Sequence, residues 1–278
     1  MPKPLATSAA GPASLHFDSE GDGPLIVLLH GFPQYRIAWQ KQMPALATAG
    51  FRAVAPDLRG YGESPKPSAI DDYRMPLVVD DVAELIRTLN GGEACIVVGH
   101  DWGAFVAWFL AMLHPDLVSR LVIMNVPHPA LFARELKRNK KQRLKAAYQL
   151  FFQLPVLPEV FMRVFGRVLL KKSGRFTREQ IDAYAANWKR CITPMLNYYR
   201  AMRKTRGELR KAMRRIDVPT LIIWGEWEPV FLPETLVGTE EWVPDLRIAR
   251  VAKAGHFIQN DAPERVNELL IEFLSSRA

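Results

Sequence analysis

The chain of 278 residues contains little cysteine and no long apolar run. Its two cysteines, Cys95 and Cys191, are too few and too far apart for a disulfide framework or a metal cluster, and we expect unpaired thiols in a reducing compartment. The longest uninterrupted apolar stretch, residues 104–113, falls far short of the ~20 residues that a membrane span needs. Residues 1–14 lack the apolar run of a signal peptide. These absences predict a soluble, cytoplasmic protein without integral membrane association.

One region of the chain is poor in acidic residues. Residues 131–215 contain 23 Lys+Arg and only 5 Asp+Glu, a net charge of +18, whereas the rest of the chain contains 14 and 24, a net charge of −10. A basic region of this kind can bind nucleic acid or an anionic membrane. No nucleic-acid motif accompanies the charge, so we expect no nucleic-acid partner. A solvated helical face is the more common explanation, and peripheral membrane contact by the apolar and basic residues 151–172 is the alternative.

Short apolar runs alternate with longer helical patterns along most of the chain. This alternation predicts an α/β fold with a mostly parallel central sheet and helices on both faces. Residues 128–215 contain only helical patterns and interrupt the alternation. We therefore expect a core domain of residues 1–127 and 216–278 with an inserted all-helical cap domain of residues 128–215. The predicted strands are residues 25–29, 51–55, 95–98, 121–124, 220–224 and 247–251, and the clearest helices are 75–89, 102–113 and 263–274.

The junction between the predicted strand 95–98 and the helix 102–113 reads Gly-His-Asp-Trp-Gly. A strand that meets a helix through Gly-x-Asp-x-Gly forces the central side chain outward on a tight turn, as in a nucleophile elbow, which usually carries Ser. Here the centre is Asp101, and a carboxylate is already ionised at neutral pH. Its attack on an sp³ carbon forms an alkyl ester, so the predicted chemistry is hydrolysis of an alkyl bond. The alternative is that Asp101 caps the helix, which does not explain the paired glycines.

Such a nucleophile needs a base and an orienting acid later in the chain. His256 follows the last predicted strand, where ligands bind in parallel sheets, and is the best-placed histidine for the base; a merely structural loop histidine is the alternative. The acid is expected after the strand 220–224, where Glu228 is the better candidate and Glu226 the reserve. An oxyanion hole would use the backbone N–H groups of Trp102 and Phe32.

Four segments of the chain form a recognisable set: His30-Gly-Phe-Pro33, Asp57-Leu-Arg-Gly-Tyr-Gly-Glu-Ser64, Gly99-His-Asp-Trp-Gly103 and Gly255-His-Phe257. Through them the chain resembles the epoxide hydrolases of the α/β-hydrolase fold, of the cytosolic or soluble type, over essentially its whole length. The resemblance implies Asp101 as the nucleophile and His256 as the base that activates water. It also implies conversion of a small lipophilic epoxide and water to a vicinal diol without metal or organic cofactor, by a monomer or homodimer. Glu228 stands where the family usually has Asp.

The resemblance further implies two cap tyrosines that hydrogen-bond the epoxide oxygen. Tyr148 begins a Tyr-x-x-x-Phe-Gln-x-Pro segment, and Tyr199, rather than Tyr198, is the tyrosine that precedes Arg in the second segment. Two phenols suit the reaction because ring opening creates an alkoxide that must be protonated. The alternative is that both tyrosines only pack the cap on the core.

Two other functions compete with this interpretation. A haloalkane or haloacetate dehalogenase of the same fold also uses an elbow Asp, but such enzymes commonly have Asn at the position of Phe32 or Arg at the position of Trp102. A more distant alternative is a non-catalytic binding module with a basic, membrane-contacting cap. Because every member of the triad is present, we expect an enzyme.

Overall fold

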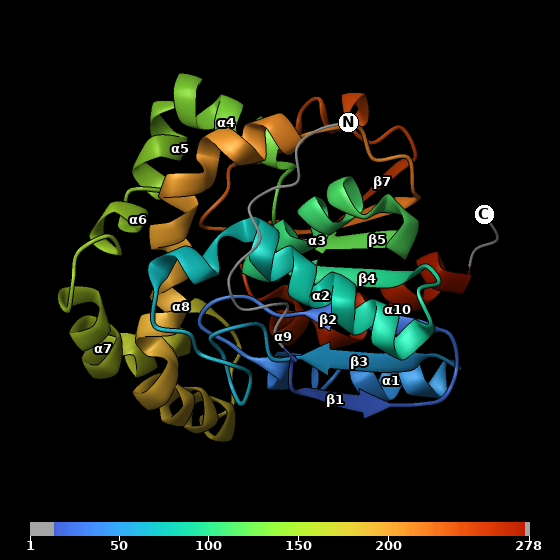
Figure 1. Cartoon of the computed structure of the whole chain (residues 1–278), viewed down its shortest axis with the longest axis horizontal. Coiled ribbons are helices and arrows are strands. Elements are labelled where there is room, and N and C mark those ends of the chain that lie inside the picture. The colour runs from blue at the N-terminus through green and yellow to red at the C-terminus, as the bar shows by residue number, and fades with distance from the viewer. Residues whose placement is uncertain (1–13, 276–278) are drawn as a thin grey trace.

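Seven strands form one sheet within residues 14–275, the part of the chain that the computed structural model describes (Figure 1). The strand order is β1-β3-β2-β4-β5-β6-β7, and all neighbours pair in parallel except β1 and β3. The sheet is therefore mostly parallel, as predicted. The strands span β1 Phe17–Glu20, β2 Leu25–Leu29, β3 Arg52–Pro56, β4 Cys95–His100, β5 Val118–Met124, β6 Thr220–Gly225 and β7 Leu246–Val251.

The central strands β2, β4 and β6 are buried along their whole length. Strands covered on both faces carry continuous apolar runs rather than alternating ones, and these runs made all three predictable to within two residues at either end. The sequence pattern does not predict β1, because only the half-buried Phe17 is apolar and the Asp-Ser-Glu that follows it is exposed. This edge strand is held by antiparallel backbone pairing with β3 rather than by apolar burial.

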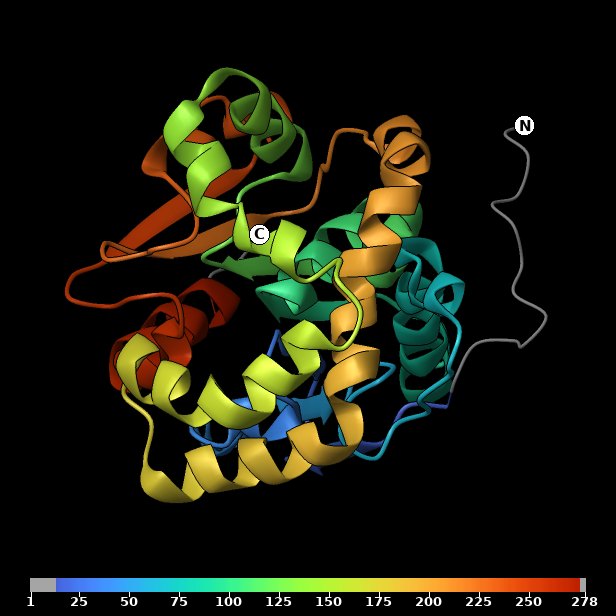
Figure 2. The ribbon, with the colours of Figure 1, turned by 90° about the vertical axis from the view of Figure 1, so that its left-hand side faces the viewer.

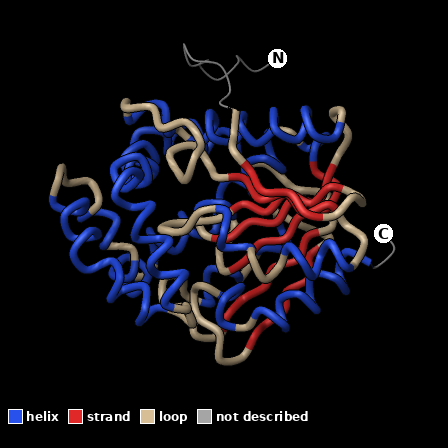
Figure 3. Tube along the Cα trace, turned by 90° about the horizontal axis from the view of Figure 1, so that it is seen from below, coloured by secondary structure: helices blue, strands red, loops and turns tan. Residues whose placement is uncertain are grey.

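Helices cover both faces of the sheet, so that alternate strand residues enter two separate cores (Figure 3). Val27 and Leu29 of β2 pack with α2, Met75–Asn90, and α3, Trp102–Leu113. Ile26 and Leu28 pack with α1, Met43–Thr48, and α10, Pro263–Ser275. The remaining short elements of the core are η1 Arg36–Trp39, η2 Ile70–Tyr73, η3 Pro115–Leu117, η4 Pro233–Leu236, η5 Thr239–Glu241 and α9 Ile258–Asp261.

Between β5 and β6 the described chain forms only helices, as the sequence predicts. We call these five helices the cap helices; they gather beyond one end of the sheet, at the left of Figure 1, and face the viewer in Figure 2. A capping box between Thr177 and Gln180 starts the longest of them. The cap helices span α4 Pro129–Arg138, α5 Lys140–Lys145, α6 Tyr148–Phe151, α7 Leu157–Ser173 and α8 Arg178–Ala212.

Hydrogen bonds from α8 fasten the cap helices to the core. The Tyr198 hydroxyl donates to the carbonyl oxygen of Arg59 at 2.7 Å, and the Trp188 indole N–H donates to that of Pro33 at 2.8 Å. Arg59 itself forms a buried, two-pronged ion pair with Asp81 on α2. The segment 57–64, one of the four that carry the family resemblance, therefore also anchors α8 to the core.

Within residues 14–275, no helix is both long enough and apolar enough to span a bilayer. Cys95 and Cys191 are both buried and free. Residues 1–13, which include nearly all of the segment predicted not to be a signal peptide, lie outside the described residues, as do residues 276–278.

Candidate active site

Asp101 occupies a strained turn between β4 and α3. Its backbone has φ 50° and ψ −117°, a conformation that side chains other than glycine rarely adopt. The flanking glycines permit this turn because helix and strand backbones touch there. A Cβ atom on Gly99 would lie 2.5 Å from the carbonyl oxygen of Gly103, and one on Gly103 would lie 2.1 Å from that of Leu29.

The Asp101 carboxylate is not used as a helix cap, since it makes no capping hydrogen bond to α3. One oxygen, Oδ1, accepts a hydrogen bond of 2.6 Å from the backbone N–H of Phe32. The other, Oδ2, lies 3.5 Å from Nε2 of His256. Gly31 must be glycine here, because a Cβ atom on it would lie 2.3 Å from the Cβ of Asp101. The capping alternative is thus disfavoured, and the carboxylate is aimed at the base predicted from the sequence.

Glu228 meets the other side of the His256 ring. Its Oε2 lies 2.8 Å from Nδ1 of His256, and its Oε1 accepts hydrogen bonds from the backbone N–H groups of Val230 at 2.6 Å and Phe231 at 3.3 Å. The Glu228 side chain is only 1% exposed, whereas Glu226 is exposed to solvent. Of the two candidate acids, the structure brings Glu228 to the imidazole.

Charge and burial set the ionisation of this cluster. Burial raises the pKa of Asp101, but the hydrogen bond and charge of His256 outweigh it, so the pKa lies below its ordinary value. Burial lowers the pKa of His256, but the charges and hydrogen bonds of Glu228 and Asp101 raise it to about 10. At neutral pH the resting site therefore holds an imidazolium between two carboxylates.

Two buried polar residues that the sequence did not assign support His256. Asn125, directly after β5 and with φ 57°, donates through Nδ2 to the carbonyl oxygens of Gly255 and His256 at 2.8 Å, and its Oδ1 accepts from the N–H of Gly225 at 2.6 Å. His100 Nε2 also lies 2.8 Å from the His256 carbonyl oxygen. A polar residue at the carboxyl end of a buried strand was the available signal for Asn125.

Residues 57–64 support the turn that carries Phe32 through hydrogen bonds and contribute no reactive group to the site. His30 is fully buried, burial lowers its pKa to about 4, and its neutral ring accepts a hydrogen bond of 3.0 Å from the N–H of Leu58. Asp57 accepts from the N–H groups of Arg36 at 3.0 Å and Glu63 at 2.9 Å. These contacts fix the Phe32 amide in front of Asp101.

The two candidate tyrosines come from different cap helices and lie together beside the elbow. The Tyr148 and Tyr199 ring centroids are 6.1 Å apart, and the Tyr199 ring packs against Trp102 at 4.9 Å and Phe32 at 5.4 Å. The Tyr198 hydroxyl, by contrast, donates its hydrogen bond to the carbonyl oxygen of Arg59. Burial, together with nearby ionisable groups that include Asp101, holds the pKa values of Tyr148 and Tyr199 above the ordinary tyrosine value, so both are neutral donors at pH 7.

Within residues 14–275, no group of three or more His, Cys, Asp or Glu side chains is arranged to hold a metal ion.

The backbone N–H of Trp102, the other predicted oxyanion donor, belongs to the first residue of α3. Amides in the first turn of a helix have no acceptor within the helix, so this one is available to a developing negative charge. The site thus brings together a buried carboxylate, two neutral phenols and an imidazole ring.

Comparison with known proteins shows the family of the chain. The family model described as alpha/beta hydrolase fold matches residues 24–263. The chain is 40% identical to the AB hydrolase superfamily protein YfhM of Bacillus subtilis, over 95% of each chain. It is 34% identical to Epoxide hydrolase 3 of Xenopus tropicalis, over 93% of this chain and 74% of that protein.

Solved structures place the chain in the same group. An epoxide hydrolase from Bacillus megaterium, solved with an inhibitor, superposes with a TM-score of 0.87 at 35% identity, covering 95% of this chain and 98% of that one. The potato (Solanum tuberosum) epoxide hydrolase superposes with a TM-score of 0.83 at 29% identity, covering 97% and 98%. The chain belongs to the α/β-hydrolase fold family and, within it, to the epoxide hydrolases.

Proposed function

We propose that this protein converts a lipophilic epoxide and water into a vicinal diol through a covalent ester on Asp101. The observation that carries the proposal is an ionised elbow carboxylate with one oxygen held by the Phe32 amide at 2.6 Å and the other facing His256 at 3.5 Å. The predicted cap domain, residues 128–215, would supply the acid groups from above. Several aromatic rings, including Phe105, Phe152 and Phe231, surround the site and favour an apolar substrate.

In the first step Oδ2 of Asp101 attacks a ring carbon of the epoxide. A new carbon–oxygen bond forms, the ring carbon–oxygen bond breaks, and its electron pair stays on the epoxide oxygen. Tyr148 or Tyr199 gives its proton to that alkoxide, while Oδ1 remains on the Phe32 amide as the ester carbonyl. Neutral phenols suit this task because burial keeps their protons on at pH 7.

Formation of the ester also prepares the base. Esterification removes the charge of Asp101, one of the two carboxylates that raise the pKa of His256. The imidazolium can then return the missing proton to the tyrosinate and become neutral. Glu228, which keeps its hydrogen bond to Nδ1, leaves Nε2 free to accept a proton.

In the second step neutral His256 takes a proton from water, and the resulting hydroxide attacks the ester carbonyl carbon. The N–H groups of Phe32 and Trp102 stabilise the negative oxygen of the tetrahedral intermediate. Collapse breaks the bond between the carbonyl carbon and the substrate-bound oxygen, and His256 protonates the departing alkoxide. The new carboxylic acid then gives its proton to His256, which restores the resting ion pair.

The experiment that tests this proposal removes the base. The variant His256→Gln should still form the ester but hydrolyse it slowly, so intact-mass spectrometry after epoxide treatment should find an increase of one substrate mass, located on Asp101 by peptide mapping. A haloalkane and a fluoroacetate incubated in parallel should release no halide. Absence of the adduct, or its location on another residue, would refute the ester; halide release without diol formation by the native enzyme would favour the dehalogenase alternative.

A further inference from the structure

The outer face of α7 exposes an unusual amount of apolar surface. Six of its side chains are each at least 43% exposed, and Val164 at 60% and Leu157 at 59% are the most exposed. We call them the α7 stripe: Leu157, Val160, Val164, Phe165, Val168 and Leu169. In the preceding segment, Leu150 and Val156 are also more than 60% exposed. A contiguous exposed apolar patch of this kind typically marks an interaction surface.

The stripe is not the core-facing side of the helix. Met162, Gly166 and Leu170 of α7 are buried, and Gly166 lies so close to α8 that a Cβ atom on it would be 2.6 Å from the Trp188 ring. At 3.6 residues per turn, these three positions lie on the face opposite Leu157, Val164 and Val168. The helix is therefore apolar on both sides, and only one side is used by the fold. Figure 2, which faces the cap helices, shows α7 in front of the sheet.

The charged side chains that α7 exposes to solvent are all cationic. Four cationic side chains are exposed on α7, namely Arg163, Arg167, Lys171 and Lys172, and Arg167 pairs with Asp182 of α8. The only carboxylate of α7, Glu159, is 6% exposed and pairs with Arg200 at 2.9 Å. The surface that α7 itself offers to solvent is thus apolar and positively charged.

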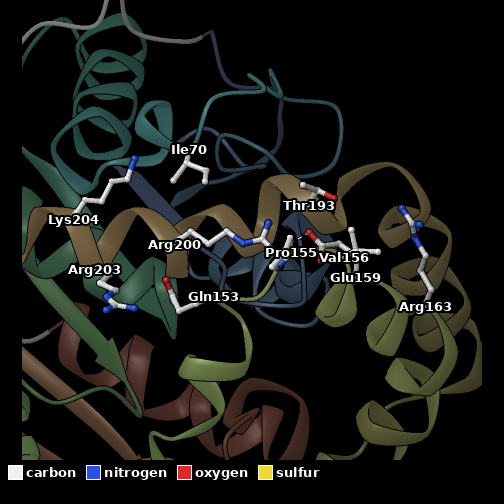
Figure 4. A pocket seen from close by; sticks show the side chains of 10 residues that line it. All are labelled: Ile70, Gln153, Pro155, Val156, Glu159, Arg163, Thr193, Arg200, Arg203 and Lys204. Atoms are coloured by element: carbon white, nitrogen blue, oxygen red, sulfur yellow. Dashed lines mark ion pairs between the residues drawn. The ribbon is translucent and has the colours of Figure 1, made fainter.

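A groove of about 820 Å³, lined in part by the exposed Val156 just before α7, adds further cations (Figure 4). Arg163, Arg200, Arg203 and Lys204 line it together with Val156 and other residues, and Glu159 is its only carboxylate. Arg200 and Lys204 are paired, the latter with Asp71 at 2.7 Å. Arg163 and Arg203 form no ion pair with any residue of the described part of the chain. The groove therefore offers uncompensated positive charge next to exposed apolar side chains.

The chain holds one of these apolar side chains outward at the expense of backbone strain. Val156 has φ 66° and ψ −47°, and the N–H of Leu157 donates to the carbonyl oxygen of Pro155 at 2.7 Å, which closes a strained γ-turn. Val156 is 66% exposed in this turn. Strain that persists without burying an apolar side chain is expected where the exposed group has a function.

We propose that the α7 stripe and the adjoining groove rest on an anionic phospholipid bilayer, with the apolar side chains in the interface and the cations on lipid phosphates. A second copy of the chain is a poor occupant, because a symmetric contact would set these cations against one another. Exposed apolar side chains next to cationic ones are what an anionic bilayer surface attracts. If the proposed function holds, this contact would deliver lipophilic epoxides that partition into the membrane.

The test is vesicle co-sedimentation of the full chain. Native protein should bind vesicles of phosphatidylcholine mixed with phosphatidylglycerol, bind phosphatidylcholine alone much less, and be released by salt. The variant Arg163→Gln with Lys171→Gln should bind about 30-fold more weakly, the loss expected for two surface cations. The variant Val164→Ser with Phe165→Ser should bind about tenfold more weakly at every salt concentration.

Matched controls lie on the core. Arg250→Gln with Lys253→Gln removes two exposed cations, and Val237→Ser removes an apolar side chain that is 62% exposed; neither should change binding by more than twofold. Failure of the native protein to bind anionic vesicles, or equal losses in the core controls, would overturn the proposal. So would a native dimer, seen by sedimentation velocity, that the Val164→Ser, Phe165→Ser variant dissociates.

A separate readout keeps this proposal distinct from the proposed function. Turnover of a water-soluble epoxide without vesicles should be the same in the native protein and in both α7 variants. Equal turnover together with lost vesicle binding supports the membrane contact. Vesicle binding by a native protein that hydrolyses no epoxide would preserve the surface while refuting the epoxide chemistry.

Discussion

The core side of the candidate site and the cap side are built from different interactions. Asp101, His256 and Glu228 are joined by charge and by hydrogen bonds from backbone amides, and a missing Cβ atom at Gly31 leaves room for the carboxylate. Tyr148 and Tyr199 are surrounded mainly by aromatic rings and are electrically neutral. The core therefore fixes charges in position, whereas in the proposed mechanism the cap tyrosines donate protons from an apolar surrounding. Substitutions on either side should therefore have separable effects.

The largest expected effect comes from removing the core nucleophile. Asp101→Ala should lower kcat for diol formation by about 10⁴-fold or more, because the phenols and the imidazole cannot form the ester by themselves. The matched control is Glu226→Ala, which removes an exposed carboxylate two residues from Glu228 and should keep activity within about twofold. Diol formation is measured by chromatography. An Asp101→Ala enzyme within tenfold of the native rate would rule out the carboxylate as nucleophile.

Removal of both cap phenols should have the next largest effect. Tyr148→Phe with Tyr199→Phe keeps the aromatic packing but leaves the alkoxide without a donor, so kcat should fall about 10³-fold. Tyr198→Phe is the matched control: it loses only the hydrogen bond to the Arg59 carbonyl and should lower the free energy of unfolding by about 1 kcal/mol with kcat retained. The same epoxide assay and a denaturant titration distinguish these outcomes. Equal activity in the double variant and the native protein would remove the phenols from the mechanism.

The smallest expected effect is a pH dependence of stability that comes from the core alone. The pKa of His256 is raised in the folded protein to about 10 from an ordinary value of about 6.5. The stability contributed by its protonated form is therefore complete below pH 6.5 and is lost as pH rises through 10. Native Tm should fall more between pH 6.5 and 10 than the Tm of His256→Gln. The Tm of the Tyr148→Phe, Tyr199→Phe variant should fall with pH as the native Tm does, since the pKa values of both phenols lie above their ordinary value. Parallel Tm curves for the native protein and His256→Gln would contradict the pairing of His256 with the two carboxylates.

The sequence predicts the core side of the contrast better than the cap side. Strands such as β2 and β4 are recognisable as apolar runs, and the pair Gly99 and Gly103 predicts the tight turn between β4 and α3. Both features are local in the chain, so they can be recognised without tertiary contacts. The order of nucleophile, acid and base then follows from where the strands end.

The sequence favours Glu228 over Glu226 as the acid, but no local pattern decides between them. What separates them is a tight turn in which the amides of Val230 and Phe231 bind Glu228 while Glu226 points to solvent. Asn125 escaped prediction because its three partners lie about 100 and 130 residues away. These contacts exist only after β5, β6 and the His256 loop have come together.

The outer surface of α7 was the hardest part to predict. Apolar residues recur on both sides of this helix, and periodicity alone does not tell which side α8 covers. The structure answers this through Gly166, which admits the Trp188 ring and turns Val164 and Val168 outward. The basic residues that a composition count detects are thereby found around an apolar surface rather than around a solely polar one.

The hydrogen bonds of Asn125 bear on how this enzyme could be altered. Within residues 14–275, every hydrogen bond to the side chains of Asp101, His256 and Glu228, and to the carbonyl oxygens that Asn125 holds, comes from outside the cap helices. Asp101, His256 and Glu228 are thus held by the core alone, whereas Tyr148 and Tyr199 belong to the cap helices. Directed evolution of substrate range can therefore vary the cap helices around these two tyrosines, with the alignment of Asp101, His256 and Glu228 inherited unchanged from the core.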